Sequence, residues 1–164
     1  MRYDRSKANR GRISGMRRLR AMEEDDYDAM IELWRGVDGL ELSGADSREG
    51  IAKYLARNPG MSFVAEAEGR IVGTVLGGHD GRRGFINHLA VDPACRGQRI
   101  GAELTERCLG AIAADGIGKC HIFVKSDNEI GKGFWARTGW SKRSGFDVFS
   151  RDAAVLELKR EEAR

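Results

Sequence analysis

The segment from residue 85 to residue 124 constrains the fold more than any other part of the chain. It begins with an apolar, β-forming run from Phe85 to Val91, and Asp92-Pro93 ends this run because proline cannot donate to a strand ladder. A basic turn, an amphipathic helical pattern and a second apolar run from Cys120 to Val124 follow. This order predicts a crossover that makes the two strands parallel neighbours. The apolar face of the predicted helix consists of Ile100, Leu104, Cys108, Ala111 and Ile112.

The chain before this unit is typical of one strand, two helices and a hairpin. Acidic residues 23–26 suit the positive N-terminus of a helix that runs to about Arg35. Two β-forming runs flank the turn at Glu68-Gly69, and a further turn leads into Phe85, so three successive antiparallel strands are expected. The predicted ranges are strands 17–22, 62–66 and 70–76, and helices 23–35 and 51–55.

After residue 124 the pattern predicts one more helix and short terminal strands. The run Ser126-Asp-Asn-Glu129 fits a capping box that opens a helix containing Phe134 and Trp135, and Gly139 is placed to end it. Trp140 and residues 146–149 are predicted to supply terminal strands, and residues 157–164 a frayed helix. The order β-α-α-β-β-β-α-β-α-β predicts an α+β fold with a mixed sheet and one parallel crossover.

The length of 164 residues with 41% hydrophobic content predicts a single domain over residues 16–164. Residues 1–20 hold eight Lys or Arg against one Asp, and residues 1–15 lack apolar periodicity, so a flexible basic extension is expected there. This extension is either an arm for nucleic acid or an anionic surface, or sequence ahead of a start at Met16. We favour the second interpretation, which does not make nucleic acid an expected partner.

Cysteine spacing and hydropathy predict a cytoplasmic protein without a membrane span. No apolar run approaches the roughly 18 to 20 residues that a span needs, and the N-terminus lacks the apolar core of a signal peptide. Cys95, Cys108 and Cys120 match neither zinc spacing nor a disulfide framework, so free thiols and no metal are expected. Cys95, beside the basic turn, is either a core residue or a reactive thiol.

The basic turn from Arg96 to Ala102 has the composition of an anion-binding loop. Gly97 and Gly101 lack Cβ atoms, so the backbone can approach phosphate oxygens at the start of a helix. Arg96 and Arg99 add charge-assisted donors, which makes a diphosphate the natural ligand. Neither a P-loop nor a dinucleotide-binding glycine motif is present. The alternative is a solvated, arginine-rich helix start.

Three motifs in register resemble the GNAT acetyltransferase superfamily. They are Leu89-Ala-Val-Asp-Pro93 at a strand end, the turn Arg96-Gly-Gln-Arg-Ile-Gly-Ala102, and Asn128 followed by Phe134-Trp135 and Gly139-Trp140. The resemblance extends over about residues 17–152 and is greatest to the small YpeA-like bacterial members. It implies a mixed, mostly antiparallel twisted sheet with helices on both faces.

The resemblance also implies a set of residues for acetyl-CoA, the expected cosubstrate. The backbone of Leu89, Ala90 and Val91 would pair with the pantetheine arm like an added strand. The diphosphate would bind at Arg96, Gly97, Gln98, Arg99, Ile100, Gly101 and Ala102. The backbone N–H of Leu89 would donate to the oxyanion. Asn128 would touch the pantetheine or adenosine part, or else only tighten a helix N-terminus.

The sequence departs from the family pattern at two places that matter for catalysis. Arg99 stands where the middle glycine of the turn is usual, so either its φ is ordinary or the loop is strained. Trp135 stands where many members have the tyrosine that protonates the leaving thiolate, and an indole N–H is not a usable acid. For the base, His88 has the right titration range, although a half-buried surface histidine is the alternative. His79 and His121 are weaker candidates.

These features predict an N-acetyltransferase whose acceptor, a primary amine, attacks acetyl-CoA directly in a ternary complex. The acceptor is a small molecule, an amino acid or a protein N-terminus, and a homodimer is compatible with the sequence. Asp38, Glu41 and Asp46 lie in the loop between the first two helices, where they either suit a cationic acceptor or are simply solvated. The alternatives are a non-catalytic sensor or scaffold that binds CoA or acyl-CoA, and a nucleic-acid binder that uses the basic arm.

Overall fold

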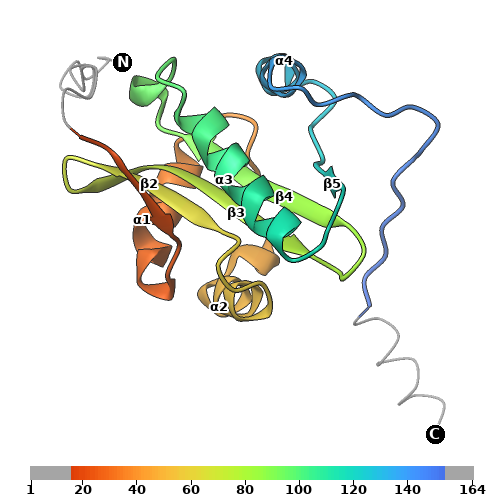
Figure 1. The fold of residues 1–164 in the computed structure, drawn as a ribbon, viewed down its shortest axis with the longest axis horizontal. Helices are drawn as coiled ribbons and strands as arrows, with labels where there is room; N and C mark the ends of the chain where they lie inside the picture. Colours follow the sequence, from red (N-terminus) through yellow and green to blue (C-terminus); the bar gives the residue numbers. More distant parts are fainter. Residues whose placement is uncertain (1–15, 154–164) are drawn as a thin grey trace, which may run out of the picture.

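The computed structural model describes residues 16–153 and contains one five-stranded sheet in the order β1-β2-β3-β4-β5 (Figure 1). The predictions for residues 1–15 and 157–164 lie outside the described residues. The strands are β1 (Arg18–Ala21), β2 (Phe63–Ala67), β3 (Arg70–His79), β4 (Gly84–Val91) and β5 (Cys120–His121). The helices are α1 (Tyr27–Arg35), α2 (Arg48–Arg57), α3 (Ile100–Ala114) and α4 (Glu129–Arg137), with short 3-10 turns η2 (Glu24–Asp26), η3 (Gly44–Asp46) and η4 (Pro93–Cys95).

The sheet confirms the predicted α+β topology with a single parallel crossover. Neighbouring strands from β1 to β4 pair antiparallel, whereas β4 and β5 pair parallel through α3. The helix α2 is longer than predicted, because Ser47 caps it by accepting the backbone N–H of Gly50 at 3.1 Å.

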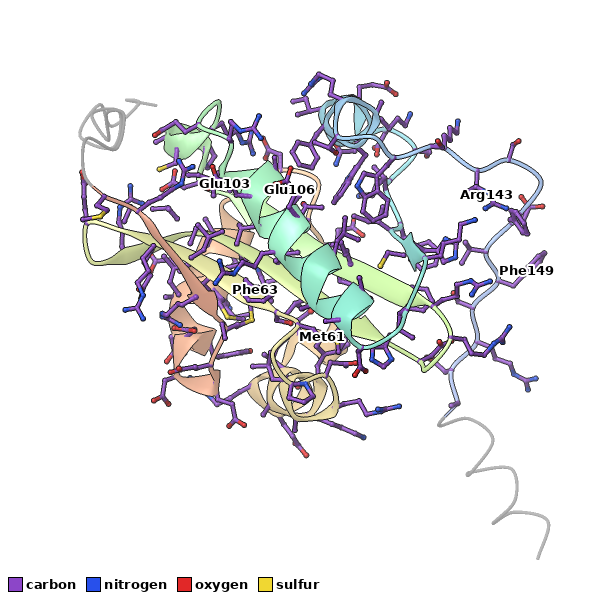
Figure 2. All side chains as sticks on the ribbon, in the orientation of Figure 1. Met61, Phe63, Glu103, Glu106, Arg143 and Phe149 are labelled. Carbon is purple, nitrogen blue, oxygen red and sulfur yellow. The ribbon has the colours of Figure 1, made fainter. Side chains whose placement is uncertain are left out.

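The predicted strands at the C-terminal end of the domain are the main error. The second crossover strand spans only Cys120–His121, and the described part of the chain after α4 contains no strand. Phe146 and Phe149 are exposed on a segment that runs apart from the sheet, as Figure 2 shows for Phe149. A strand needs a partner ladder for its backbone groups, and the short β5 provides almost no edge for one.

Helices cover both faces of the sheet, as predicted. Alternate residues of β2 enter opposite clusters: Phe63 packs under α3, whereas Val64 packs toward α1 and α2. The cluster on the α1 face contains Met30, Trp34, Ile51 and Leu76, all buried. Figure 1 shows α3 crossing the front of the sheet, so α1 and α3 are separated by the strands.

Glycines in the sheet allow α3 to lie very close to the strands. A Cβ atom on Gly77 would lie 2.2 Å from Sγ of Cys108 and 2.4 Å from the carbonyl oxygen of Met61. A Cβ on Gly73 would likewise lie 2.9 Å from the side chain of Ile100. The helix that carries the basic turn is therefore seated directly on the backbone of β3.

The start of α4 differs from the predicted capping box. Asn128, not Ser126, is the N-cap, and its Oδ1 atom accepts the backbone N–H of Gly131 at 2.8 Å. A turn with a hydrogen bond from Asn128 N to Lys125 O precedes the helix, so Ser126 lies before the helical geometry begins.

Candidate active site

A bulge interrupts strand β4 at His88 and Leu89. The pairing with β3 moves from Leu76↔Asn87 to Thr74↔Ala90, so β4 contains one residue more than β3 over this stretch. His88 has a φ of +46°, in the left-handed region that non-glycine residues seldom adopt. Such a bulge changes the direction of backbone groups within a strand.

Buried groups behind the sheet hold this bulge in place. The indole N–H of Trp34 donates to Oγ1 of Thr74 at 2.7 Å, and the Thr74 hydroxyl donates to the carbonyl oxygen of His88 at 3.3 Å. Trp34 and Thr74 are both fully buried. The left-handed backbone of His88 is thus supported by a chain of hydrogen bonds from α1 through β3.

The imidazole of His88 is fixed by the loop before α2. Nε2 of His88 lies 2.6 Å from Oδ1 of Asp46, and the ring meets the Trp34 indole edge-on with centroids 4.6 Å apart. Oδ2 of Asp46 accepts hydrogen bonds from the backbone N–H of Ser43 at 2.7 Å and from its hydroxyl at 3.2 Å. The sequence analysis placed Asp46 in the loop but missed its pairing with His88. The Ser43-x-x-Asp46 spacing signals a turn that draws this carboxylate inward.

Beyond the bulge, β4 separates from β5. Their pairing consists of Gly84↔Cys120 and Phe85↔His121, so it stops before Leu89, Ala90 and Val91 are reached. Leu89 and Val91 are half-buried against the α3 side of the core. The last three residues of β4 therefore lie next to a gap where the two parallel strands have separated.

The basic turn lies directly after this strand and enters α3 through two left-handed residues. Gly97 has φ +75°, and Arg99, the N-cap of α3, has φ +63° and no side-chain capping bond. Of the two alternatives for Arg99, the structure has the strained one, at a typical cost of about 1 to 3 kcal/mol. Arg96 and Arg99 are exposed, and neither pairs with a carboxylate of residues 16–153.

Arg17 stabilises this turn, although the sequence indicates only that it belongs to the first strand. Its Nη1 atom donates to the carbonyl oxygen of Gln98 at 2.8 Å, and its guanidinium also forms an ion pair with Glu103 on α3. The two hydrogen-bonded residues are 81 positions apart in the chain. No local pattern signals such a contact.

The end of β4, the basic turn and α4 meet at Gly101. A Cβ atom there would lie 3.3 Å from the ring of Phe134 and 3.6 Å from Cγ2 of Val91. Trp135 is 8% exposed and packs edge-on between Phe134 and Trp140, with ring centroids 5.0 and 4.9 Å apart. One residue from each of the three motifs, Val91, Gly101 and Phe134, therefore lies at this meeting point.

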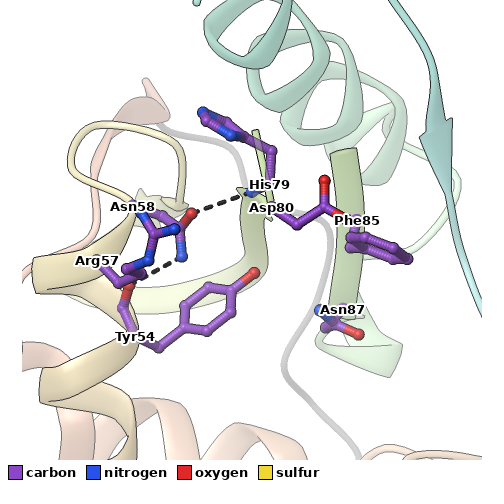
Figure 3. A pocket seen from close by; sticks show the side chains of 7 residues that line it. All are labelled: Tyr54, Arg57, Asn58, His79, Asp80, Phe85 and Asn87. Carbon is purple, nitrogen blue, oxygen red and sulfur yellow. Dashed lines mark hydrogen bonds between the residues drawn. The ribbon is translucent and has the colours of Figure 1, made fainter. Parts of the chain in front are cut away.

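Two adjoining cavities lie on the α2 side of His88. The first, which we name the His88 cavity, has a volume of about 740 Å³ and is lined by residues that include His88, Asp46, Glu41, Lys53 and Arg57. The second, the His79 cavity, measures about 360 Å³ (Figure 3). Both cavities share Tyr54, Arg57 and Asn87 as lining residues. Together these adjoining cavities make a shared hollow beside the bulge, bounded by those three residues.

The family model for GNAT acetyltransferases matches residues 18–140 of this chain. The chain belongs to the GNAT acetyltransferase family. An acetyltransferase of Pectobacterium atrosepticum is 36% identical to it over 119 residues, which cover 73% of this chain and 84% of that protein. An acetyltransferase of Photorhabdus laumondii is also 36% identical, over 111 residues that cover 68% of this chain and 77% of that protein. This GNAT protein is therefore an acyltransferase of the N-acetyltransferase type.

Solved GNAT structures confirm the fold. The PaiA N-acetyltransferase of Thermoplasma acidophilum, solved in complex with coenzyme A, matches with a TM-score of 0.67. The match covers 85% of this chain and 94% of that one at 18% sequence identity.

The remaining histidines of this GNAT acetyltransferase lie away from the bulge. Nε2 of His79 is 2.6 Å from Oδ2 of Asp115 at the far end of α3. His121 lies on β5 against Phe85, with ring centroids 6.0 Å apart. Of the three histidines, only His88 lines the larger cavity.

The cysteines are poor nucleophiles in this structure. Burial raises the pKa of the Cys108 thiol to about 12. Burial also raises the pKa of Cys95 and of Cys120, and the nearby Asp92 carboxylate adds to the effect at Cys95. A raised pKa leaves little thiolate at neutral pH, which favours a buried structural role for Cys95.

Two further features of residues 16–153 concern metal ions and membranes. No group of three or more His, Cys, Asp or Glu side chains gathers there in a metal-binding arrangement. In the same residues, none of the helices has the length and apolar character that spanning a bilayer requires.

Proposed function

We propose that this protein transfers the acetyl group of acetyl-CoA to a primary amine by direct attack within a ternary complex. The observation that carries the proposal is the convergence of three features at one place. These are the bulge at His88 and Leu89, the separation of β4 from β5, and the basic turn at the start of α3. A thioester held between the strands would have its diphosphate at the turn and its carbonyl group beside the bulge.

Residues 96–102 would hold the diphosphate of the cosubstrate. The first N–H groups of α3 have no partner within the helix, and the positive end of its dipole favours an anion. The exposed guanidinium groups of Arg96 and Arg99 add charge-assisted hydrogen bonds. The pantetheine arm would pair with the free edge of Leu89, Ala90 and Val91, next to Asn128 and Trp135 of α4.

The backbone N–H of Leu89 would stabilise the oxyanion that forms when the amine attacks the thioester carbonyl carbon. Removing one such donor from other enzymes costs about 2.7 to 4 kcal/mol of transition-state stabilisation. The hydrogen bonds from Trp34 and Thr74 fix the carbonyl group of the preceding residue, so they also fix the peptide plane that contains this N–H.

His88 would accept the proton that the attacking amine loses. With its Nε2–H donated to Asp46, the imidazole has its lone pair on Nδ1, available to the amine directly or through one water. The C–N bond forms, the C–S bond breaks, and coenzyme A leaves as a thiolate. Because Trp135 has no acidic proton, water would protonate this thiolate.

Steady-state kinetics with acetyl-CoA and a panel of primary amines tests the proposal. We expect acetylated amines in the mass spectrum and initial-rate lines that intersect, as a ternary complex requires. Parallel lines would instead indicate an acetyl-enzyme and would overturn direct attack. Tight CoA binding without transfer to any amine in the panel would favour the non-catalytic sensor. The variant Arg96→Ala/Arg99→Ala serves as the control, with weaker CoA binding expected.

A further inference from the structure

The charged groups around the His88 cavity differ in whether they already have partners. Both carboxylates that line the cavity are engaged: Asp46 by His88 and Ser43, and Glu41 by an ion pair with Lys125. Lys125 therefore balances the charge of Glu41, whereas Asp46, beside a neutral His88, keeps its charge and has its oxygens directed at His88 and Ser43. This arrangement does not favour the cationic acceptor that the acidic loop suggested from the sequence.

The two cations of the cavity have no such partners. Lys53 and Arg57 lie four residues apart on one face of α2, and both line the cavity. Within residues 16–153 neither forms an ion pair, whereas Arg48 on the same helix pairs with Asp28 at 2.6 Å. The lining cations without an ionic partner, both from α2, therefore outnumber the one lining carboxylate without a cationic partner, that of Asp46.

Neutral donors lie beside these cations. Tyr54 is on the same face of α2, and Figure 3 shows its side chain directed toward the shared hollow, which Arg57 also lines. Burial raises the pKa of the Tyr54 hydroxyl, so it stays protonated and can donate a hydrogen bond. Asn87, on β4, lines the same hollow with an amide group.

The smaller cavity contains one carboxylate, that of Asp80, which would oppose an anion. Asp80 accepts the backbone N–H groups of Arg82 and Arg83, both at 2.8 Å, and these bonds lower its pKa and keep it charged. Asp80 does not line the His88 cavity. An anion would therefore bind on the Lys53 side of Arg57, away from Asp80.

We infer that the acceptor is a primary amine that also has an anionic group, a carboxylate or a phosphate, which Arg57 and Lys53 bind. The amine end points toward His88 and the separated strands, where the thioester would lie. The anionic end lies against α2, where an arginine fork and an ammonium group provide charge-assisted hydrogen bonds. This inference rests on the proposed function, because it assigns the substrate class of the same site.

Matched acceptors test the inference. All four compounds have a primary amine, and they differ in the second group. This group is an uncharged hydroxyl in ethanolamine, a carboxylate in β-alanine, a phosphate in phosphoethanolamine and a second amine in putrescine. We expect kcat/KM to be at least about tenfold higher for one of the anionic amines than for ethanolamine and putrescine. The comparison of β-alanine with phosphoethanolamine distinguishes the two sources of negative charge.

The variant Lys53→Gln/Arg57→Gln should remove this preference by raising KM for the anionic acceptor. Arg48→Gln, on the same helix but outside the cavity lining, is the matched control and should keep the preference. An unchanged preference in the double variant, or a preference for putrescine in the natural protein, would overturn the inference while leaving acetyl transfer intact.

Calorimetric titration of phosphoethanolamine and β-alanine into the protein with CoA bound gives a readout that needs no turnover. We expect binding that Lys53→Gln/Arg57→Gln abolishes. Such binding without acetyl transfer would contradict the proposed function and support the anion site. Transfer to amines without any binding difference between the variants would contradict the anion site and support the proposed function.

Discussion

Nε2 of His88 lies 2.6 Å from Oδ1 of Asp46, and this contact joins the bulge of β4 to the loop that precedes α2. If His88 takes the proton from the amine, Asp46 acts through it by holding the imidazole in one tautomer and orientation. We expect His88→Gln to lower kcat by about 100-fold, the lower end of general-base effects. Asp46→Asn should lower kcat by less, and neither variant should change CoA affinity.

The double variant His88→Gln/Asp46→Asn separates a positioning role from a purely structural one. If Asp46 works only through His88, the double variant loses no more kcat than His88→Gln alone. Losses that multiply, with the fold intact by circular dichroism, would show that Asp46 does not act through the histidine.

Trp135 is expected to contribute an apolar wall rather than a proton. It packs between Phe134 and Trp140 and is almost fully buried, and its indole N–H is no usable acid. Trp135→Phe should therefore reduce kcat by about tenfold or less, because no proton passes through the ring. Stopped-flow or steady-state assays above and below neutral pH provide the measurement. A thousandfold loss with CoA affinity intact would contradict this account.

Because α3 packs so closely on β3, one added methyl group should have a large effect on the free energy of unfolding. In Gly77→Ala the new Cβ would collide with Sγ of Cys108 and with the carbonyl oxygen of Met61, so we expect a loss of about 1 to 3 kcal/mol in the free energy of unfolding. Urea denaturation measures it. Gly110→Ala in α3 is the matched control, since nothing lies within 4 Å of its Cβ site, and it should gain about 0.5 to 1 kcal/mol.

The stability of the fold in acid is expected to depend on the ion pairs that Arg20 forms. Burial alone would raise the pKa of the Asp26 carboxyl, but hydrogen bonds from Arg20 and from the backbone of Glu23 bring that pKa below its ordinary value. The Arg20 hydrogen bond also lowers the pKa of Glu66. A lowered pKa in the folded state gives stability that is present above the unfolded pKa of about 4 and is lost as the pH falls.

Arg20→Gln should therefore lower the free energy of unfolding at pH 7 by about 1 to 3 kcal/mol, since the buried Asp26 loses its donor. It should also lose less stability than the natural protein between pH 7 and pH 3. Urea midpoints at the two pH values measure both effects. An unchanged pH dependence would show that this ion pair does not control acid unfolding. Arg48→Gln is the control: it removes only an exposed ion pair with Asp28, so it should change the free energy of unfolding little.

Local sequence patterns predicted most of the fold because the responsible forces act between near neighbours in the chain. The period-two and three-to-four spacings of apolar residues located the sheet and the helices that cover it. The strand–helix–strand order of residues 85–124 predicted the parallel pairing of β4 with β5. The crossover helix returns the chain to the edge of the sheet where β4 began, so β5 runs in the same direction. The basic turn was also visible, because its glycines and arginines are adjacent in the sequence.

Where local patterns failed, contacts outside the pattern itself decided the outcome. The run Phe146-Asp-Val-Phe149 has the alternating pattern of a strand, but β5 is too short to provide a ladder for it. The capping box at Ser126 matched a known spacing, yet the preceding turn placed Asn128 at the helix start instead.

The sequence by itself thus determined the order of the elements as far as α4, the family and the turn that suits a diphosphate. Tertiary structure alone decided the distant contacts. The Asp46 carboxylate meets the His88 ring, the Arg17 guanidinium meets the carbonyl oxygen of Gln98, and Lys53 and Arg57 line one cavity. The reason is physical. Patterns within a helix or strand depend on a repeat of a few residues, whereas these contacts depend on how separate elements pack, and no spacing in the chain encodes that geometry.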